Sequence, residues 1–450
     1  MLLGLEVAAA HAVGALSRVS GRGGGTTLPG KLLVAINPSA VERLGAELPL
    51  GSVVVSATNG KTTTTAMLAE ILDARLAYNR SGANLLSGVA STLLASRGAE
   101  LGLFEVDVAG LPEVARRLRP RVVALGNLFR DQLDRYGELE LVADGWRRML
   151  AELPGARLVV NADDPRLGEL ARGHRALLAY GLDDPSHGRG SLPHAADSKR
   201  CVSCGASYGY AAVYVGHLGD YRCPVCGNAR LALDVSAAEI ELRGLEGSAF
   251  TLRTPAGTAR VSLTLPGLYN VYNATAAAAV ALALETPLAQ IVAGLGRFVA
   301  AFGRFERIPV GDKVLLMLLI KNPAGANEAV ATLLDGSPPS LALVALNDEI
   351  ADGRDVSWIW DVDFEPLLDG LERVIVAGGR GAELALRFAY GGLPRARIEL
   401  VSGLESALDR GLELTPAGGE LVVLPTYTAM LALRRVAARR RLVPQFWEQP

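Results

Sequence analysis

One short segment, residues 53–68, constrains the fold of this 450-residue chain more than any other stretch. Its sequence, VVVSATNGKTTTTAML, places three β-branched residues before a small polar turn, after which Gly60, Lys61 and Thr62 open an apolar helix. A strand, a Gly-Lys-Thr turn and a helix in this order form a phosphate-binding loop, because backbone N–H groups and the helix N-terminus then point towards an anion. The segment therefore predicts a nucleotide-binding α/β fold.

The same pattern assigns roles to individual residues of the loop. Lys61 would reach the β- and γ-phosphates of the nucleotide, and the hydroxyl of Thr62 would bind Mg²⁺. The first glycine of the usual pattern is Val55 in this chain, so a plain polar turn between a strand and a helix is the alternative interpretation. The other loop residues expected to contact the nucleotide are Thr58, Asn59, Gly60 and Thr63.

Composition and charge exclude several classes of protein. Half of the residues are hydrophobic, and a chain of 450 residues can bury a sizeable core in about three domains. The formal net charge of −2 argues against nucleic acid as the main partner, because nucleic-acid-binding proteins usually present a basic face. The apolar residues 1–16 lack the cationic start of a signal peptide and are too short to span a bilayer. We expect a cytoplasmic protein whose first residues form a packed or membrane-touching helix.

A glycine-rich joint, GRGGGTTLPGK, follows at residues 21–31. Glycine and proline at this density predict neither helix nor strand, so the joint should separate the N-terminal helix from the main body. The joint would act as a flexible linker or, alternatively, as a loop near the nucleotide. We therefore assign residues 1–45 to an N-terminal helix and joint.

Apolar strands and helical segments alternate after the phosphate-binding loop. Buried strands are predicted at residues 101–107, 121–127 and 156–164. This alternation predicts a mostly parallel sheet with helices on both faces, whose ligands collect beyond the carboxyl ends of the strands. Side chains with oxygen atoms stand at these ends and predict a metal–nucleotide site, because Mg²⁺ prefers oxygen ligands. They are Glu105, Asp107, Asn127, Asp131, Asn161 and Asp163.

All four cysteines lie in one polar segment, with the spacing C-x2-C-x18-C-x2-C. This spacing is typical of a four-thiolate zinc site, which leaves no open coordination position and so has a structural role. Two disulfides are the alternative, which a reducing cytosol disfavours. We predict a zinc ribbon inserted at residues 198–230, too polar to bury a core of its own and held folded by its metal. Its ligands would be Cys201, Cys204, Cys223 and Cys226.

A second alternation of strands and helices occupies the C-terminal part of the chain and predicts a Rossmann-like α/β domain. The boundaries that follow are 46–302 for a central ATP-binding domain and 303–450 for the C-terminal domain. The C-terminal strands are predicted at residues 314–320, 341–346, 373–378, 397–401 and 420–426.

Six motifs, ATNGKTTTT, FEVD, NLFRDQLD, VVNADDP, PGLYNVYNATAA and GRFE, resemble the Mur ligase family in their order and spacing. That family joins amino acids to peptidoglycan precursors: ATP phosphorylates a carboxylate to an acyl phosphate, which an amine then attacks. The resemblance implies that Lys61 and Thr62 hold the phosphates and Mg²⁺, and that Glu105 binds Mg²⁺ and takes part in catalysis. The residues implied to approach adenine or ribose, or to face the nucleotide from the C-terminal domain, are Asn270, Asn273 and Arg304.

The chain also departs from the pattern of this family. The D-H-L-D of the family is D-Q-L-D at residues 131–134, and no lysine between Lys61 and Lys199 is available to match the carbamylated lysine of many members. These losses imply one Mg²⁺ where the relatives hold two, and they keep open a catalytically inactive, Mur ligase-like scaffold as an alternative. The short segment before residue 53 makes a UDP-binding domain, and hence a UDP-linked substrate, unexpected.

The four-cysteine insert and the motifs KNPAGANE, NDEIADGRDVSWIWDVDFE and PTYTAML resemble one branch of this family, the synthetase subunits of lipid II isoglutaminyl synthase. The resemblance implies that the α-carboxylate of D-glutamate in the lipid II stem peptide is amidated to D-isoglutamine, with ATP, Mg²⁺ and a structural Zn²⁺. It implies a partner, a GatD-type glutamine amidotransferase subunit that releases ammonia from glutamine. It also implies a position at the inner face of the membrane, where lipid II is anchored.

The acidic segment 347–365 is a second candidate functional region. It holds five aspartates beside two of the chain's four tryptophans, so it is either a solvated loop or a partner surface with aromatic anchors. Amidotransferases of one class need a carboxylate to orient the histidine of their Cys-His pair. The resemblance suggests that this chain lends that carboxylate to its partner. We assign the role to Asp355, with Asp352 and Asp361 as second choices.

A zinc-ribbon P-loop ATPase that binds nucleic acid is the runner-up function. The near-neutral charge and the few basic residues of the insert argue against it, because phosphate contacts supply most of the affinity for nucleic acid. We therefore expect no nucleic acid among the partners.

Overall fold

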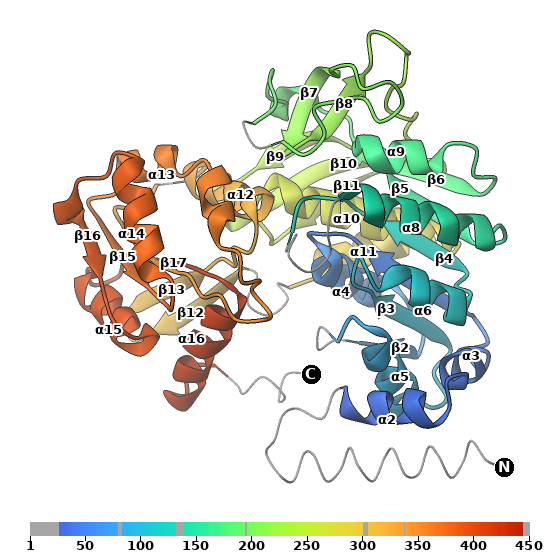
Figure 1. Ribbon diagram of the computed structural model, residues 1–450, viewed down its shortest axis with the longest axis horizontal. Coiled ribbons are helices and arrows are strands. Elements are labelled where there is room, and N and C mark those ends of the chain that lie inside the picture. Colours follow the sequence, from blue (N-terminus) through green and yellow to red (C-terminus); the bar gives the residue numbers. More distant parts are fainter. Residues whose placement is uncertain are drawn as a thin grey trace.

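The computed structural model describes residues 27–79, 83–131, 139–193, 196–299, 305–336 and 338–443. Their strands form a nine-stranded sheet, a six-stranded sheet and a separate two-stranded hairpin, and helices flank both large sheets (Figure 1). Within these ranges no helix is long and apolar enough to cross a membrane.

The nine-stranded sheet has the strand order β11-β10-β9-β6-β5-β4-β1-β3-β2. Neighbours from β2 to β9 are parallel, and β10 and β11 extend the sheet in the antiparallel sense. This confirms the mostly parallel sheet that the alternating pattern predicts. The strands are β1 Ser52–Ser56, β2 Leu76–Tyr78, β3 Leu101–Glu105, β4 Val122–Leu125, β5 Arg157–Asn161, β6 Leu177–Leu182, β9 Val235–Leu242, β10 Ser248–Thr254 and β11 Gly257–Leu263.

The valines of β1 show how helices cover both faces of this sheet. Val53 and Val55 belong to one apolar core with α4, α10 and α11, whereas Val54 belongs to a second core with α2, α3, α5, α6, α8 and α9. Successive side chains of a strand point to opposite faces, so a run of valines requires cover on both. The helices are α2 Leu28–Ile36, α3 Ala40–Gly45, α4 Lys61–Ile71, α5 Leu86–Ala95, α6 Leu111–Leu118, α8 Leu139–Glu152, α9 Pro165–Ala171, α10 Leu268–Ala283 and α11 Leu288–Arg297.

Helix α2 corrects the prediction that residues 21–31 are irregular. Pro29 stands in its first turn, where the missing N–H of proline costs nothing. The N–H of Gly30 donates to Oγ of Ser91 in α5 at 2.8 Å, and a Cβ at Gly30 would lie 1.9 Å from the backbone oxygen of Ser87. This glycine permits close packing of two helices. The predicted N-terminal helix, within residues 1–26, lies outside the described residues.

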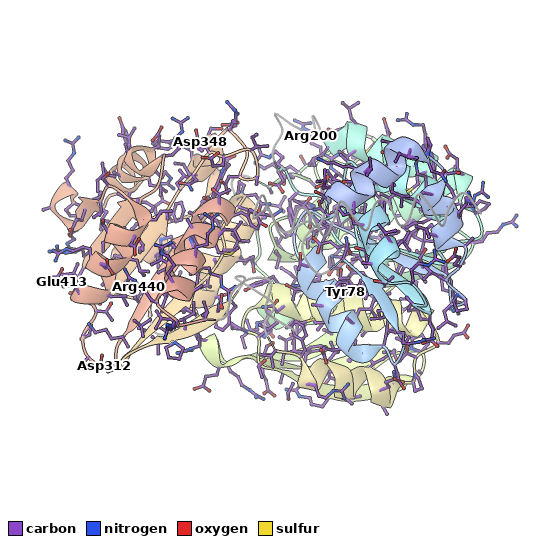
Figure 2. The ribbon with its side chains drawn as sticks, turned by 90° about the horizontal axis from the view of Figure 1, so that it is seen from below. Tyr78, Arg200, Asp312, Asp348, Glu413 and Arg440 are labelled. Atoms are coloured by element: carbon purple, nitrogen blue, oxygen red, sulfur yellow. The ribbon has the colours of Figure 1, made fainter. Side chains whose placement is uncertain are left out.

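The six-stranded sheet follows residue 305 and has the order β12-β13-β17-β14-β15-β16, with only β12 and β13 antiparallel. All five strands predicted here are present, and β12 is an additional edge strand. In Figure 2, Asp312 and Glu413 lie at the end of this region that is remote from the nine-stranded sheet. The predicted boundary at 302/303 falls outside the described residues. The elements are β12 Glu306–Val310, β13 Lys313–Met317, α12 Pro323–Leu334, β14 Leu341–Ala345, α13 Glu365–Gly370, β15 Arg373–Ala377, α14 Gly381–Tyr390, β16 Ile398–Leu400, α15 Leu404–Leu414, β17 Glu420–Pro425 and α16 Tyr427–Arg439.

The four-cysteine insert lies between β6 and β9 and is built on the antiparallel hairpin of β7, Gly209–Val215, and β8, Leu218–Arg222. Figure 1 shows this hairpin above the end of the large sheet that carries β9. A small cluster of buried residues, two cysteines with Tyr208 and Tyr221, forms its interior. Short 3-10 helices occur at η1 Pro185–His187, η2 Gly244–Glu246, η3 Ser357–Asp361 and η4 Arg395–Arg397.

Candidate functional site

The predicted phosphate-binding loop joins the carboxyl end of β1 to the start of α4. Gly60 adopts a φ of 86°, and a Cβ at this position would lie 2.1 Å from Oδ1 of Asn273. Both the left-handed backbone and the close approach of Asn273 require glycine. The N-terminus of α4 then opens directly from the turn, as an anion site requires.

Lys61 is the first residue of α4, and its ammonium group turns back over the loop. Its Nζ donates to the backbone carbonyls of Ala57 and Thr58, the latter at 3.4 Å. Burial, and then the charge of Lys321, lower the pKa of Lys61 to about 8. A phosphate in the loop would favour the charged ammonium, because an opposite charge nearby raises the pKa of a lysine.

Thr62 and Glu105, the two predicted Mg²⁺ ligands, lie in contact beside the loop. The hydroxyl of Thr62 donates to Oε2 of Glu105 at 2.6 Å. The side chain of Asn79 accepts from the N–H of Glu105 at 2.9 Å and donates to its C=O at 2.8 Å, which fixes the end of β3. A hydroxyl and a carboxylate at this spacing can share one hard cation.

Asp131 and Asp163, two further predicted residues at strand ends, have other partners. Asp131 accepts from Nζ of Lys321 at 2.8 Å. Asp163 is fully buried and accepts from the hydroxyl of Tyr272 at 2.6 Å and from Arg230 at 3.1 Å. Burial raises the pKa of Asp163 to about 6, although Arg230 opposes this shift. Asp131 and Asp163 thus contact other parts of the fold, whereas Glu105 contacts Thr62.

Asparagine side chains link the loop to β4 and to the second sheet. The N–H of Asn59 donates to Oδ1 of Asn127 at 2.9 Å, and Nδ2 of Asn127 donates back to the C=O of Asn59 at 3.0 Å. The side-chain amides of Asn59 and Asn322 donate to each other at 3.1 and 3.0 Å. Asn322 also caps α12 by accepting from the N–H of Gly325 at 2.9 Å. Asn322 was not among the predicted site residues, although it belongs to the KNPAGANE motif.

The two predicted asparagines of α10 have different positions. Asn273 faces the loop, where its Oδ1 accepts from the hydroxyl of Thr64 at 3.3 Å. Asn270 lies behind it, donates to the C=O of Pro266 at 2.8 Å and accepts from Nδ2 of Asn273 at 3.1 Å. Asn270 therefore orients Asn273. Arg304 lies outside the described residues.

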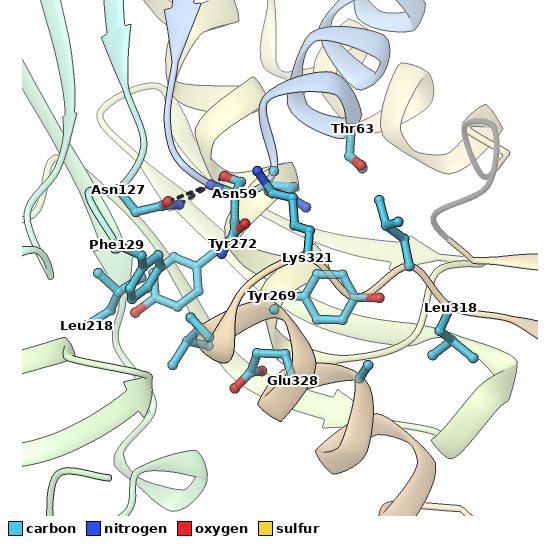
Figure 3. Close-up of a pocket in the computed structure, with 17 residues that line it drawn as sticks. Asn59, Thr63, Asn127, Phe129, Leu218, Tyr269, Tyr272, Leu318, Lys321 and Glu328 are labelled. Carbon is cyan, nitrogen blue, oxygen red and sulfur yellow. Dashed lines mark hydrogen bonds between the residues drawn. The ribbon is translucent and has the colours of Figure 1, made fainter. Parts of the chain in front are cut away.

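A cavity opens beside the loop, between α10 and α12 (Figure 3). Polar groups of the loop line one end, and aromatic and aliphatic side chains line the rest, as a flat base requires. The residues that line the cavity include Asn59, Gly60, Phe129, Leu218, Lys321 and Glu328.

Glu328 brings a carboxyl group into this cavity from α12, where Figure 3 shows it across from Asn59. The residue is 8% exposed. Burial, which disfavours the charged form, raises its pKa to about 7, although the charge of Arg189 opposes this shift. Sequence reasoning missed Glu328 because a glutamate within a helix gives no signal of burial.

Replacing Glu328 with glutamine should flatten the pH dependence of stability. The pKa is about 7 in the folded protein and 4.5 ordinarily, so ionisation opposes folding progressively as the pH rises from 4.5 to 7. As the pH rises from 5 to 8, the free energy of unfolding of Glu328→Gln should increase relative to that of the parent chain by about 2–3 kcal/mol. Urea unfolding at both pH values measures this, with the exposed Glu372→Gln as control. Equal pH dependence of parent and variant would contradict the buried environment.

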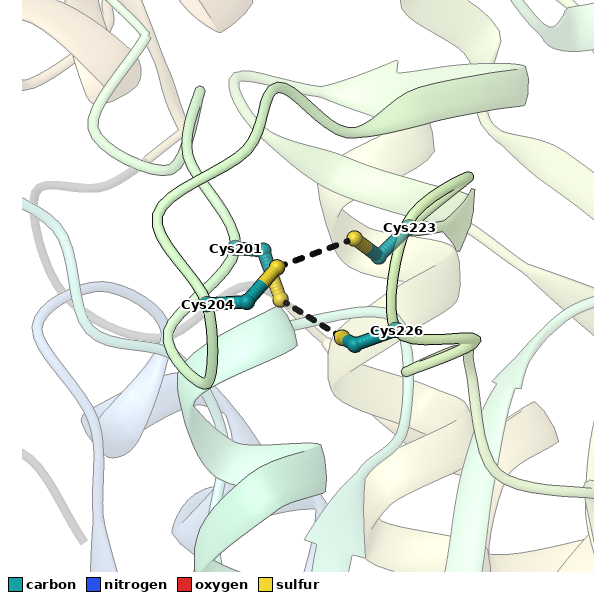
Figure 4. Close-up of side chains that lie close together, drawn as sticks. All are labelled: Cys201, Cys204, Cys223 and Cys226. Atoms are coloured by element: carbon teal, nitrogen blue, oxygen red, sulfur yellow. Dashed lines mark hydrogen bonds between the residues drawn. The ribbon is translucent and has the colours of Figure 1, made fainter.

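The four cysteines converge at the end of the insert (Figure 4). Their Sγ atoms lie within 4.8 Å of one another, and the pairs Cys201–Cys226 and Cys204–Cys223 are 3.5 Å apart. A disulfide requires about 2.0 Å, whereas sulfurs arranged tetrahedrally around zinc lie about 3.8 Å apart. The cluster therefore suggests a bound metal and excludes the alternative of two disulfides.

The protein purified without chelators should contain one zinc ion per chain. X-ray absorption should show sulfur ligands only, at about 2.3 Å. Cys226→Ser should lower the zinc content, whereas the neighbouring substitution Val225→Ala, at an exposed side chain, should not. Nitrogen or oxygen ligands, or full loading of Cys226→Ser, would contradict the four-thiolate assignment.

Two of the three aspartates proposed for the acidic segment have partners from distant segments of the chain. Asp352 is buried and accepts from the N–H of Thr428 at 2.8 Å, and burial raises its pKa. Asp361 lies 3.5 Å from the guanidinium of Arg130.

Asp355 is exposed and differs from both. It accepts from the N–H of Ser357 at 2.8 Å, and hydrogen bonds from the side chain and backbone of Ser357 lower its pKa. Its carboxylate is therefore ionised at neutral pH and accessible to another molecule.

Family comparisons cover most of the chain. The model of the Mur ligase middle domain matches residues 55–281, and the model of the MurT ligase C-terminal region matches residues 319–430. The lipid II isoglutaminyl synthase (glutamine-hydrolyzing) subunit MurT of Streptococcus pneumoniae is 33% identical over 430 residues, which is 94% of both chains. The subunit of the same name from Staphylococcus aureus is 29% identical over 413 residues, 90% of this chain and 91% of the relative.

Solved structures of low sequence identity share the fold. A pseudomurein peptide ligase type C from Methanothermus fervidus has a TM-score of 0.68 at 21% identity, covering 86% of this chain and 78% of its own. MurF ligase from Thermotoga maritima, solved in complex with ADP, has a TM-score of 0.62 at 15% identity, covering 90% and 85%. The predicted combination of two α/β regions thus matches known ligase folds.

Proposed function

This chain belongs to the MurT branch of the Mur ligase family, and we propose that it amidates the α-carboxylate of D-glutamate in the lipid II stem peptide, using ATP. The observation that carries this proposal is the likeness to a glutamine-hydrolysing isoglutaminyl synthase subunit over 94% of both chains. The phosphate-binding loop and the cavity beside it supply a place for the reaction. The product would be D-isoglutamine, a change that belongs to peptidoglycan synthesis.

The loop residues have the chemistry that phosphoryl transfer needs. The N-terminus of α4 and the ammonium of Lys61 would neutralise the phosphates, and Lys321, whose Nζ donates to the C=O of Thr58 at 3.0 Å, would add a second cation from the C-terminal region. Mg²⁺, when bound, would supply positive charge beside the phosphates. Thr62 and Glu105 would hold it, and their mutual hydrogen bond supports this assignment. The base would enter the cavity along Asn273 and the aromatic residues.

The reaction follows from this arrangement in two steps. A carboxylate oxygen of D-glutamate attacks the γ-phosphorus of ATP, so that an acyl phosphate forms and ADP leaves. Ammonia then attacks the acyl carbon, the bond to the phosphate oxygen breaks, and amide and inorganic phosphate result. The cations around the loop lower the barrier of the first step because they are in place before charge develops.

Ammonia would come from a GatD-type glutamine amidotransferase subunit bound to the C-terminal region. Asp355 would orient the histidine of that subunit's Cys-His pair. Large apolar side chains near Asp355 in the sequence are exposed: Ile350 by 74% and Trp360 by 48%, with Tyr390, 76% exposed, edge-to-face against Trp360 at 5.8 Å. Exposed aromatics of this kind anchor protein partners. Because lipid II is membrane-bound, we place the complex at the cytoplasmic face of the membrane.

The runner-up functions have less support. A nucleic-acid-binding ribbon would present a basic face, whereas the net charge is −2. An inactive scaffold would not need to keep Lys61, Thr62 and Glu105 in contact with one loop.

Incubation of this chain alone with ATP, Mg²⁺, lipid II and ammonium salt tests the proposed activity. We expect amide product, detected by mass spectrometry, because the synthetase site lies within this chain. With glutamine as nitrogen source, product should appear after addition of a GatD-type subunit. ATP-dependent product from neither source would contradict the proposal, and tight binding of oligonucleotides at low salt would favour the runner-up.

A further inference from the structure

We propose that the four-cysteine insert is part of the nucleotide site, because His217 at the tip of its hairpin positions Phe129 and thereby the phosphate-binding loop. This inference rests on the proposed binding of ATP in the cavity. It extends the expectation, drawn from the cysteine spacing, that the metal has a structural role and holds the insert folded.

The tip of the β7–β8 hairpin forms one wall of the cavity. Val215 and Leu218, on either side of the tip, both line it. Figure 3 shows Leu218 beside Phe129, on the side of the cavity away from Thr63. Gly216 adopts a φ of 58°, and a Cβ there would lie 2.7 Å from the ring of Phe129. The hairpin therefore packs so closely against Phe129 that a side chain at position 216 would clash with its ring.

His217 is completely buried at this contact. Its ring centroid lies 4.7 Å from that of Phe129, at an interplanar angle of 59°. Its Nε2 lies 3.3 Å from Oδ2 of Asp164, whose side chain is also fully buried. Asp164 accepts from the N–H of Leu128 at 2.9 Å, so the carboxylate and the imidazole together support residues 128 and 129.

Phe129 is in turn hydrogen-bonded to the phosphate-binding loop. Its N–H donates to Oγ1 of Thr58 at 3.0 Å, and the hydroxyl of Thr58 lies 3.1 Å from the C=O of Phe129. Thr58 is two residues before Gly60, and its own carbonyl accepts from Lys61 and Lys321. A displacement of Phe129 therefore moves the backbone that Lys61 and Lys321 share.

The cysteine cluster holds the end of the hairpin that lies away from the tip. Cys223 directly follows β8, and Cys201 and Cys223 are buried with Tyr208 and Tyr221 in a cluster of four residues. So small an apolar interior cannot order the cysteine-bearing end of the insert without the metal, whereas Tyr214, Val215 and Leu218 near the tip pack in the large core. Metal occupancy should therefore change nucleotide affinity through His217, even though the metal has no open position for substrate.

The test is the equilibrium dissociation constant for Mg²⁺–ADP, measured by calorimetry on the full chain with its zinc content determined in parallel. His217→Ala should weaken ADP binding about tenfold at unchanged zinc content, and His217→Gln, which keeps a donor towards Asp164, should recover part of the loss. Val225→Ala, at an exposed position beside the cluster, is the matched control. Parent protein stripped of zinc but folded by circular dichroism should also bind ADP at least about tenfold more weakly.

Unchanged ADP affinity in His217→Ala and in stripped protein would overturn the inference. If His217→Ala does not fold, the ADP affinities of Phe129→Leu and of the stripped protein are measured in its place, and unchanged values in both would overturn the inference. Failure of the parent protein itself to bind ADP is a different result, which would count against the proposed nucleotide site as a whole.

Discussion

Lys61→Ala is expected to lower ATP-dependent amidation by about 10²- to 10³-fold or more. Lys61 is a cation within the loop that would receive the phosphates, and preorganised groups of this kind contribute that much to the rate. The variant should remain folded, because the substitution removes a buried ammonium whose pKa burial already lowers to about 8. Amide product and ADP are the quantities to measure, with ammonium as nitrogen source so that the partner plays no part.

A matched control distinguishes the loss of a positive charge at the loop from the loss of one elsewhere on the protein. Lys31 is exposed on α2, so Lys31→Ala should keep the parent rate. Glu105→Ala should raise the Mg²⁺ concentration needed for half-maximal rate. If Lys61→Ala keeps the parent activity, the phosphate-binding loop is wrongly assigned; if Glu105→Ala leaves the Mg²⁺ dependence unaltered, the metal site is wrongly assigned.

Asp355→Asn is expected to lower the rate of amidation from glutamine by about 10²- to 10⁴-fold, whereas the rate from added ammonium should largely be retained. A carboxylate that orients a catalytic histidine fixes its tautomer and stabilises the imidazolium, and the amide of asparagine does neither. The hydrogen bond from Ser357 and the lowered pKa of Asp355 suit this role, because they keep the acceptor charged. Glutaminase activity with the GatD-type subunit present is the direct measurement.

The split between the two nitrogen sources identifies the residue. A variant of the synthetase site would lose both activities together, whereas Asp355→Asn should keep complex formation and ADP binding. Asp363→Asn, also exposed in this segment, should behave like the parent. If Asp355→Asn hydrolyses glutamine normally in the complex, the role moves to Asp352 or Asp361, or the segment is an interface alone.

Features with a local physical cause could be predicted from the sequence. The strand, turn and helix around Gly60 follow from residues adjacent in the chain, and the cysteine spacing predicts that the four thiols of the insert meet, as they do. Strand positions in the C-terminal region follow from apolar runs between turns. Helix α2 was missed because Pro29 and Gly30 resemble a linker, and their value in close packing against α5 depends on a helix sixty residues away.

Features created by distant contacts could not be predicted. The pairing of Asn59 with Asn127 and Asn322 joins three segments whose order in the sequence carries no sign of their meeting. The burial of Glu328 in the cavity is also set by tertiary packing. The contact of His217 with Phe129 depends on how the insert docks, which neither the cysteine spacing nor the hairpin pattern specifies.

Oxygen transfer tests the central claim most directly. The substrate is lipid II in which both oxygens of the α-carboxylate of D-glutamate are ¹⁸O. It is incubated with this chain, a GatD-type subunit, glutamine, ATP and Mg²⁺. Attack of the carboxylate on the γ-phosphorus leaves one carboxylate oxygen on the phosphate, so we predict one ¹⁸O in inorganic phosphate for each amide formed. Amide formation with unlabelled phosphate, with the label in AMP, or ATP hydrolysis without amide would contradict it.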